Sequence, residues 1–337
     1  MERRSRDNRR LQLAFAITAS VLVLAAAVSV CVGKYPISPG EILAILTGGE
    51  VEGNTAKVFY TLRLSRTAMA ALSGMGLGLA GSVYQSVFKN PLASPDIVGI
   101  SSGANLGAAV AIAAVGSAVT SVAAGAFLGG LVAVVLVVLV VQATGSPSTS
   151  TYVLSGIIIS SVAQAVIMLL KYFADSESQL AAMEYWTMGS LAAVTASKVL
   201  SVLPFWLVGF VGLLLLRRQI QLLSLSEEEC RALGVRLRQV RWTVLGLSTL
   251  LVSSVICVTG LISFAGLIAP HIAALMIRRR DGHAMVLSAL VGGAVLLIAD
   301  ILARSLHSAE LPISILTTLI GVPILVWFMY ARKERRV

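Results

Sequence analysis

Long apolar runs recur along this 337-residue chain, and they constrain its fold more than any other feature. Hydrophobic residues make up 57% of the sequence and charged residues only 12%, and the mean hydropathy is +0.90. One soluble core cannot bury that much apolar surface. The sequence therefore predicts an all-α polytopic membrane protein.

About 20 apolar residues are needed for each crossing of a bilayer. On this basis the chain is expected to form ten transmembrane helices within a single membrane domain, residues 1–337. The predicted spans are Leu11 to Val32, Leu64 to Val87, Ile97 to Val115, Val119 to Val141, Tyr152 to Leu170, Val199 to Leu216, Trp242 to Gly260, Ile262 to Ile277, Met285 to Leu302 and Leu311 to Tyr330.

The basic residues test this count. With ten spans, 19 of the 26 basic residues fall on the side of the amino terminus, and both termini lie on that side. The positive-inside rule then places both termini in the cytoplasm of a plasma (inner) membrane. The same asymmetry explains the net charge of +10, because the basic residues form short clusters between apolar runs and do not indicate a nucleic-acid partner. The other seven are Lys34, Lys57, Arg63, Arg66, Lys171, Lys198 and Arg304.

The longest charged interruption, about residues 219–241, has the pattern of a short capped helix. Ser226 is the expected N-cap, Glu227 to Glu229 fill the first turn, where the helix dipole favours acids, and Gly234 is the expected stop. Such a segment is either a solvated connector or a helix that a cytoplasmic partner can grip.

Two other segments are expected to leave the helical conformation. The connection Asn90–Asp96 carries Pro91 and Pro95, and Gly260–His271 carries two glycines and Pro270. The first is either a rigid turn or irregular backbone that lines a cavity, and in the second some backbone groups need partners other than those of a regular helix. The uncharged loop Gly145–Thr151 is either a plain linker or a gate.

Small residues crowd the second, third and fourth spans, often four residues apart, and predict close helix packing. Short helices are expected within Tyr35–Leu46, lying on the membrane surface, and between Lys171 and Lys198. His271 is interpreted as a packed histidine rather than a proton carrier or haem ligand.

Arg63, Arg66 and Arg304 fall at the outer edge of the predicted bundle. They either reach the lipid headgroups or receive carboxylates of a docking protein. Asp300 is the only carboxylate within the spans, and the chain contains no nucleotide-binding GxxxxGK[ST] motif. A transporter of this kind would take its energy from a partner.

Several segments, in the same order, resemble the FecCD-type permeases of ABC importers, the family of cobalamin, haem and ferric-siderophore importers. The matching stretches are Leu62–Arg66, Gly78–Gly81 with Gln85, Asn90–Asp96 with Gly99–Ala104, Trp186–Leu191, Ala232–Val235, Gly260–His271, and Ala299–Arg304 with Glu310–Ile313. The sequence departs from the family pattern at Ser65, where proline is usual, and at Ser314, where glycine is common.

The resemblance implies a dimeric type II ABC importer: a homodimer, two cytoplasmic ATPase subunits and an extracytoplasmic binding protein that delivers the cargo. The permease itself would be no enzyme and would carry no cofactor, since ATP and Mg²⁺ bind the ATPase. The resemblance assigns roles to three groups of residues. Arg63, Arg66 and Arg304 would dock the binding protein. Ser148, Thr149 and Ser150 would form the cytoplasmic gate. The ATPase would be contacted by Glu227, Glu228, Arg231, Ala232, Leu233 and Gly234.

The expected function is ATP-driven uptake of an iron chelate (siderophore), haem or cobalamin by alternating access. A secondary transporter or channel without ATPase subunits is the alternative, but it requires intramembrane ionisable residues or an inverted repeat, and neither is evident. A membrane anchor for a haem-bearing redox complex would require more usable histidines than the three present.

Overall fold

The computed structural model describes residues 2–333 apart from residues 34, 36, 50, 52, 146, 147, 176, 226, 235 and 308. All regular structure in this part of the chain is helical. The helices are α1 (Glu2–Cys31), α2 (Pro39–Thr47), α3 (Gly53–Val58), the π-helix η1 (Phe59–Leu64), α4 (Ser65–Val87), the 3-10 helix η2 (Pro95–Val98), α5 (Ile100–Val115), α6 (Val119–Ala143), α7 (Thr149–Phe173), α8 (Gln179–Met188), α9 (Ala196–Leu215), α10 (Arg217–Leu222), α11 (Glu227–Ala232), α12 (Leu237–Thr259), α13 (Ala265–Ile277), α14 (Gly282–Ser305) and α15 (Ile313–Lys333).

Each of the ten predicted spans coincides with a helix. Within the described residues, α1, α6, α7, α9, α12 and α14 are long and apolar enough to cross a membrane, and α5, α13 and part of α15 are shorter apolar helices. The tenth, α4, has 23 residues and is rich in glycine, alanine and serine. The all-helical, multi-pass prediction is therefore confirmed.

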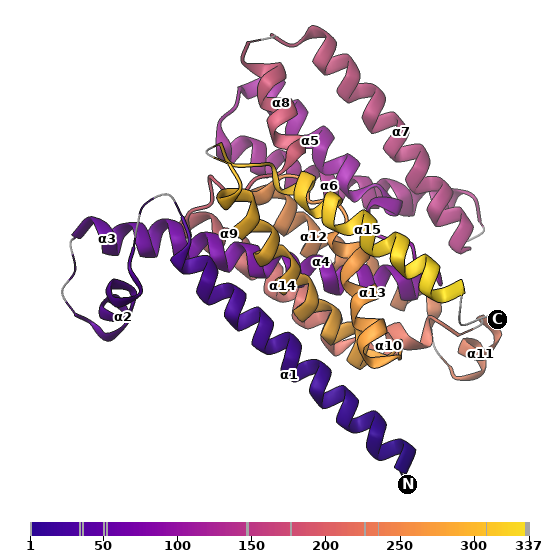
Figure 1. Cartoon of the computed structure of the whole chain (residues 1–337). Helices are drawn as coiled ribbons and strands as arrows, with labels where there is room; N and C mark the ends of the chain where they lie inside the picture. Colours follow the sequence, from indigo (N-terminus) through magenta and orange to yellow (C-terminus); the bar gives the residue numbers. More distant parts are fainter. Residues whose placement is uncertain are drawn as a thin grey trace.

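The bundle has two distinct ends. Figure 1 shows the start of α1 and the end of α15 at one end, near α10 and α11, with α2 and α3 at the other. The start of α7 lies at the first end, and α7 runs along one side of the bundle. The two termini thus lie towards the same end, as an even number of crossings requires.

The predicted close packing between small residues is confirmed at the α5–α6 contact. A Cβ atom added to Gly107 would overlap the carbonyl oxygen of Gly125, and one added to Gly103 would overlap that of Gly129. Contacts of the same kind join α4 to α14, through Gly74 and Gly292. Because lipid tails are as apolar as the helices, this close approach supplies the van der Waals contact that holds them together.

The expected departure from helix at Gly260–His271 is confirmed only as far as Phe264, because α13 begins at Ala265 and continues through Pro270. Proline has no N–H, so the carbonyl of Gly266, four residues earlier in α13, loses its usual partner. That oxygen lies against Gly81 of α4, where a Cβ atom would overlap it. Pro270 therefore helps to explain why α4 carries a glycine at position 81.

The short helices predicted outside the spans are also present. α2 begins with a capping box, in which Glu41 N donates to Ser38 Oγ (3.2 Å) and Ser38 N donates to Glu41 Oε2 (2.7 Å). The hydrogen bonds from Ser38 hold the pKa of Glu41 below its ordinary value. α8 is the short helix expected between Lys171 and Lys198.

The α5–α6 packing gives a stability prediction with an internal control. Gly107→Ala should destabilise the protein by about 1–3 kcal/mol, because the new methyl group meets backbone that cannot move aside. Gly246→Ala lies within α12 and meets no atom within 4 Å, so it should be neutral or stabilise by up to about 1 kcal/mol. Thermal unfolding in detergent measures both, and equal melting temperatures for the two variants would contradict the packing argument.

Candidate functional site

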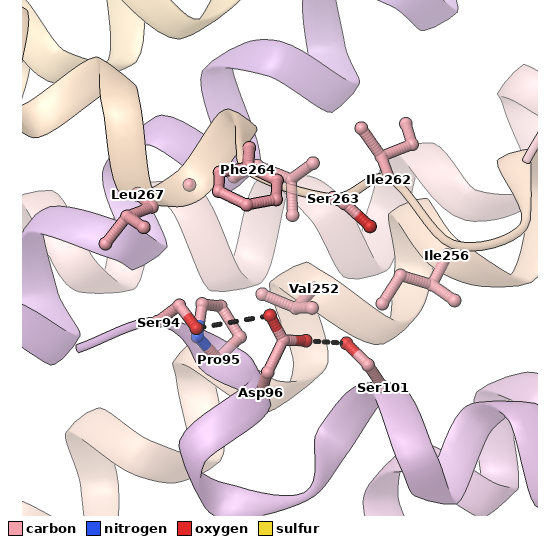
Figure 2. Close-up of a pocket in the computed structure, with 12 residues that line it drawn as sticks. Ser94, Pro95, Asp96, Ser101, Val252, Ile256, Ile262, Ser263, Phe264 and Leu267 are labelled. Atoms are coloured by element: carbon pink, nitrogen blue, oxygen red, sulfur yellow. Dashed lines mark hydrogen bonds between the residues drawn. The ribbon is translucent and has the colours of Figure 1, made fainter. Parts of the chain in front are cut away.

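The two predicted helix breaks line one cavity. Figure 2 shows the turn at Ser94–Asp96 on one side and the segment Ile262–Phe264 on the other. The cavity has a volume of about 180 Å³, and residues near the middle of α4 and α12 complete its wall. Both segments thus line a cavity, which for the Asn90–Asp96 connection was one of the two interpretations left open by the sequence.

Asp96 is the acidic residue of this cavity. Its Oδ2 accepts a hydrogen bond from Ser94 Oγ (3.1 Å), and its Oδ1 accepts one from Ser101 Oγ. Asp96 is exposed, and no basic side chain among the described residues forms an ion pair with it. The cavity therefore combines hydroxyl groups and a carboxylate with an apolar wall.

Phe264 stands at the point where the chain re-enters α13. It has a φ of 62°, a left-handed conformation that is rare for a bulky side chain. Such backbone persists only where its surroundings hold it in place, and it gathers at functional sites. The unusual conformation supports a functional interpretation of the cavity beside it.

The predicted gate residues lie at the start of a helix, which corrects the expectation that they belong to a loop. Ser148 is the N-cap of α7, accepting a hydrogen bond from Thr151 N at 3.1 Å, and Thr149 and Ser150 form the first turn. Ser148 and Ser150 are exposed and Thr149 is half-buried. Ser146 and Pro147, in the preceding loop, lie outside the described residues.

The predicted coupling segment contains two short helices, α10 and α11. Cys230 anchors α11, because its buried Sγ donates to the carbonyl of Leu222 at 2.9 Å. Ala232, Leu233 and Gly234 are exposed, and Gly234 has a φ of 70°, consistent with its predicted role as a helix stop.

Part of the predicted coupling segment lies outside the described residues. The expected N-cap Ser226 lies outside the described residues, as do the side chains of Glu227 and Arg231, while Glu228 is exposed. The helix ends at Ala232.

Arg63 and Arg304 are buried, with 5% and 7% of their surfaces exposed, and they cap the end of α1. Arg63 donates to the carbonyls of Val30 (2.8 Å) and Cys31 (2.7 Å). Arg304 donates to those of Ser29 and Val32, both at 2.8 Å. These carbonyls stand at the C-terminal end of α1, where no further helical N–H groups are available, and the negative end of the helix dipole attracts cations.

Arg66 belongs to the same cluster but is more accessible, with 12% of its side chain exposed. It forms ion pairs with the fully buried Asp300 (2.9 Å) and with Glu310 (2.9 Å), and Arg304 also pairs with Asp300 (3.3 Å). Asp300 is therefore the buried link between α4 and α14, and Glu310 is a partner that sequence reasoning missed.

The structure separates the predicted sites into two groups. The gate and the coupling segment lie at the end that contains the start of α1, whereas the arginine cluster surrounds the other end of α1 (Figure 1). His271 is 1% exposed and packs edge-on against Phe328 with ring centroids 4.4 Å apart, as expected for a packed histidine. Within the described residues, no group of three or more His, Cys, Asp or Glu side chains is placed to share a metal ion.

Known proteins with similar sequences are transport permeases. The chain is 36% identical over 319 residues to the molybdate import system permease of Haemophilus influenzae, covering 93% of this chain and 94% of that one. It is 34% identical to the Fe(3+)-citrate import system permease of Bacillus subtilis, covering 99% and 98%. It is 36% identical to the hemin transport system permease of Yersinia pestis, covering 83% and 85%.

The fold has a solved counterpart. A chain from an inward-facing conformation of a metal-chelate type ABC transporter superimposes with a TM-score of 0.86 and 33% identity, covering 95% of this chain and 99% of that one. The family model described as the FecCD transport family matches residues 21–331. By sequence and by fold, the chain belongs to the FecCD transport family, whose members here are permease subunits of ABC importers.

Proposed function

We propose that two copies of this chain form the membrane part of an importer driven by ATP hydrolysis on partner subunits. Each copy would cross a plasma (inner) membrane ten times with both termini in the cytoplasm. This arrangement is supported by the ten helices at the predicted spans, by the termini lying towards one end of the bundle, and by the excess of basic residues in the segments at that end.

The observation that carries the proposal is the exposed tip of α11. Its Cys230 side chain faces the bundle, while Leu233 is 61% exposed at the end where α12 begins. An apolar side chain exposed directly after a short, anchored helix suits a groove on a cytoplasmic partner. We assign that groove to each of two ABC ATPase subunits, which would bind ATP and Mg²⁺, and assign no cofactor to this chain.

The proposed dimer places α7 and α15 beside the transport pathway. α7 is among the least buried of the long apolar helices, since only 22% of its most apolar stretch is buried. Its exposed face includes Leu154, Ile157 and Val162. α15 exposes Leu319 and Trp327. A second copy would cover part of these faces, and membrane lipid the rest. The first turns of the two α7 helices, with Ser148, Thr149 and Ser150, would form the cytoplasmic gate.

The opposite end of the bundle would receive the extracytoplasmic binding protein. The cluster of Arg63, Arg66, Arg304, Asp300 and Glu310 has a net charge of +1 and would favour acidic residues of that partner. Arg63 and Arg304 already donate hydrogen bonds to the end of α1. We therefore assign direct contact mainly to Arg66, and to the other two the role of holding the end of α1 in place beside it.

The proposed cargo is an iron chelate or haem, with cobalamin as a further member of the same class of bulky ligands. Two of the relatives described above are named for Fe(3+)-citrate and hemin, whereas one is named for molybdate. Binding of haemin, ferric citrate, ferric siderophores, corrinoids and molybdate to the cognate binding protein would decide among them. Binding of molybdate alone would overturn the assignment.

Copurification tests the energy source. Expressed with a candidate ABC ATPase, the chain should be isolated in a complex that contains two copies of each subunit and hydrolyses ATP. Cation-gradient-driven uptake by the chain alone, without an ATPase, would instead establish the secondary-transporter alternative.

The conformation of Gly234 gives a sharper test of coupling. Its positive φ disfavours β-branched residues by about 1–2 kcal/mol, whereas asparagine tolerates this conformation, and a Cβ atom at this position would meet nothing within 4 Å. Gly234→Val should therefore lower the amount of ATPase that copurifies and its ATP hydrolysis, while Gly234→Asn should retain most of both. Equal behaviour of the two variants, with normal membrane insertion, would argue against a coupling role for this turn.

Glu310 offers a test of docking that leaves every arginine in place. If Arg66 receives a carboxylate of the binding protein, Glu310 competes for it, and Glu310→Gln should tighten binding about twofold to fivefold at low salt, the range of partly exposed ion pairs. The matched control is Glu184→Gln, which removes the partner of Lys171 in another ion pair (2.7 Å). Titration of the binding protein at several salt concentrations measures the effect, and unchanged affinity would remove Arg66 from the docking site.

A further inference from the structure

The first turns of α7 and α12 are joined by side chains that the proposed function does not yet use. Trp242 Nε1 donates a hydrogen bond to the hydroxyl of Tyr152 at 2.9 Å. The guanidinium of Arg241 lies over the Tyr152 ring, 5.6 Å from its centroid, and that of Arg238 lies over the Trp242 ring at 4.8 Å. Tyr152 is therefore held by two neighbouring residues of α12.

This contact lies between the two regions that would have to move together. Tyr152 stands one turn after the gate residues Ser148–Ser150, at the start of α7. Trp242 stands near the start of α12, and only residues 233–236 separate α12 from α11. A displacement of α11 therefore reaches Trp242 through one short connection and the first turns of one helix.

Burial fixes the side chains of Tyr152 and Arg241, whereas the side chain of Trp242 is partly exposed. Tyr152 is 1% exposed and Arg241 is 7% exposed, so the hydrogen bond and the ring contact are shielded from water. Trp242 and Arg238 are more accessible, and they border a cavity of about 90 Å³ together with Gln142 and Gly145. The space beside Trp242 allows its ring to shift without displacing the core.

Elsewhere α7 and α12 make little direct contact. α7 packs mainly against α5, α6 and η2, and in Figure 1 it lies along one side of the bundle. α12 in turn is largely buried beyond Val244 and packs against α6 and α9. Movement of its first turns can reach α7 directly through the Tyr152–Trp242 contact, and otherwise only through α5, α6 and η2, which touch both helices.

We propose that Tyr152, Trp242 and Arg241 form a latch that carries movement of the coupling segment to the first turn of α7. Tyr152 and Trp242 are then positioning residues of the cytoplasmic gate. This inference rests on the proposed function, and it adds the connection by which the ATPase end of α12 would open and close the gate.

The test uses the full complex with its ATPase subunits in proteoliposomes and follows the gate without requiring the cargo. Cys31 is replaced by serine, the buried Cys230 and Cys257 stay in place, and Ser150→Cys supplies one accessible site for a membrane-impermeant maleimide. Its labelling rate is measured without nucleotide and with ATP, Mg²⁺ and vanadate, alongside ATP hydrolysis. The variants are Tyr152→Phe, Trp242→Phe and the double substitution.

The matched control is Trp206→Phe. Trp206 Nε1 donates a hydrogen bond of the same length, 2.9 Å, to the carbonyl of Leu72, but it joins α9 to α4 away from the gate. If the latch exists, each single latch variant should reduce the ATP-dependent change in labelling about twofold to tenfold, the range for loss of one hydrogen bond. ATP hydrolysis should continue, and the double variant should resemble the single ones because both remove the same bond.

Three results would overturn the latch. One is a wild-type labelling response in both single variants. Another is a loss of response in Trp206→Phe equal to that in the latch variants, which would indicate general destabilisation. The third is a parent complex that hydrolyses no ATP or shows no nucleotide-dependent labelling, and this result alone would overturn the proposed function as well.

Discussion

Backbone carbonyls at the ends and breaks of the helices need partners inside the protein, because lipid offers none. At the end of α1 the buried Arg63 and Arg304 supply these partners, because they donate hydrogen bonds to four carbonyls between Ser29 and Val32. In α13, Pro270 leaves the carbonyl of Gly266 without its usual helical donor, and that oxygen lies where only a glycine at position 81 of α4 can pack. Asp300 then balances two of the arginines and ties α4 to α14.

The same constraint explains why the candidate sites stand where they do. Irregular backbone at Ser94–Asp96 and Ile262–Phe264 is tolerated where it borders a cavity, and these two segments border the same one. The exposed short helix α11 lies at the end of the bundle, where water can satisfy its backbone. α7 and α1 are the least buried of the long apolar helices, and the proposed gate residues lie at the start of α7.

The sequence was sufficient for the arrangement along the chain. Apolar runs located all ten principal helices, and Gly234 marked the end of the coupling helix, because both signals depend on neighbouring residues. It was insufficient where the outcome depends on distant partners. The sequence left Arg63 and Arg304 as candidates for docking, because their partners, the carbonyls at the end of α1, lie about 30 and 270 residues away along the chain. The Tyr152–Trp242 contact joins residues 90 positions apart and leaves no local pattern.

Whether the coupling segment contacts an ATPase is tested most directly by a photo-reactive amino acid at position 233. Leu233 is 61% exposed at the tip of the coupling segment, and Leu43 of α2, 64% exposed at the opposite end of the bundle, is the comparison site. Illumination of the assembled complex should cross-link position 233, but not position 43, to the ATPase subunit. No cross-link from position 233, in a complex that still hydrolyses ATP, would contradict the account.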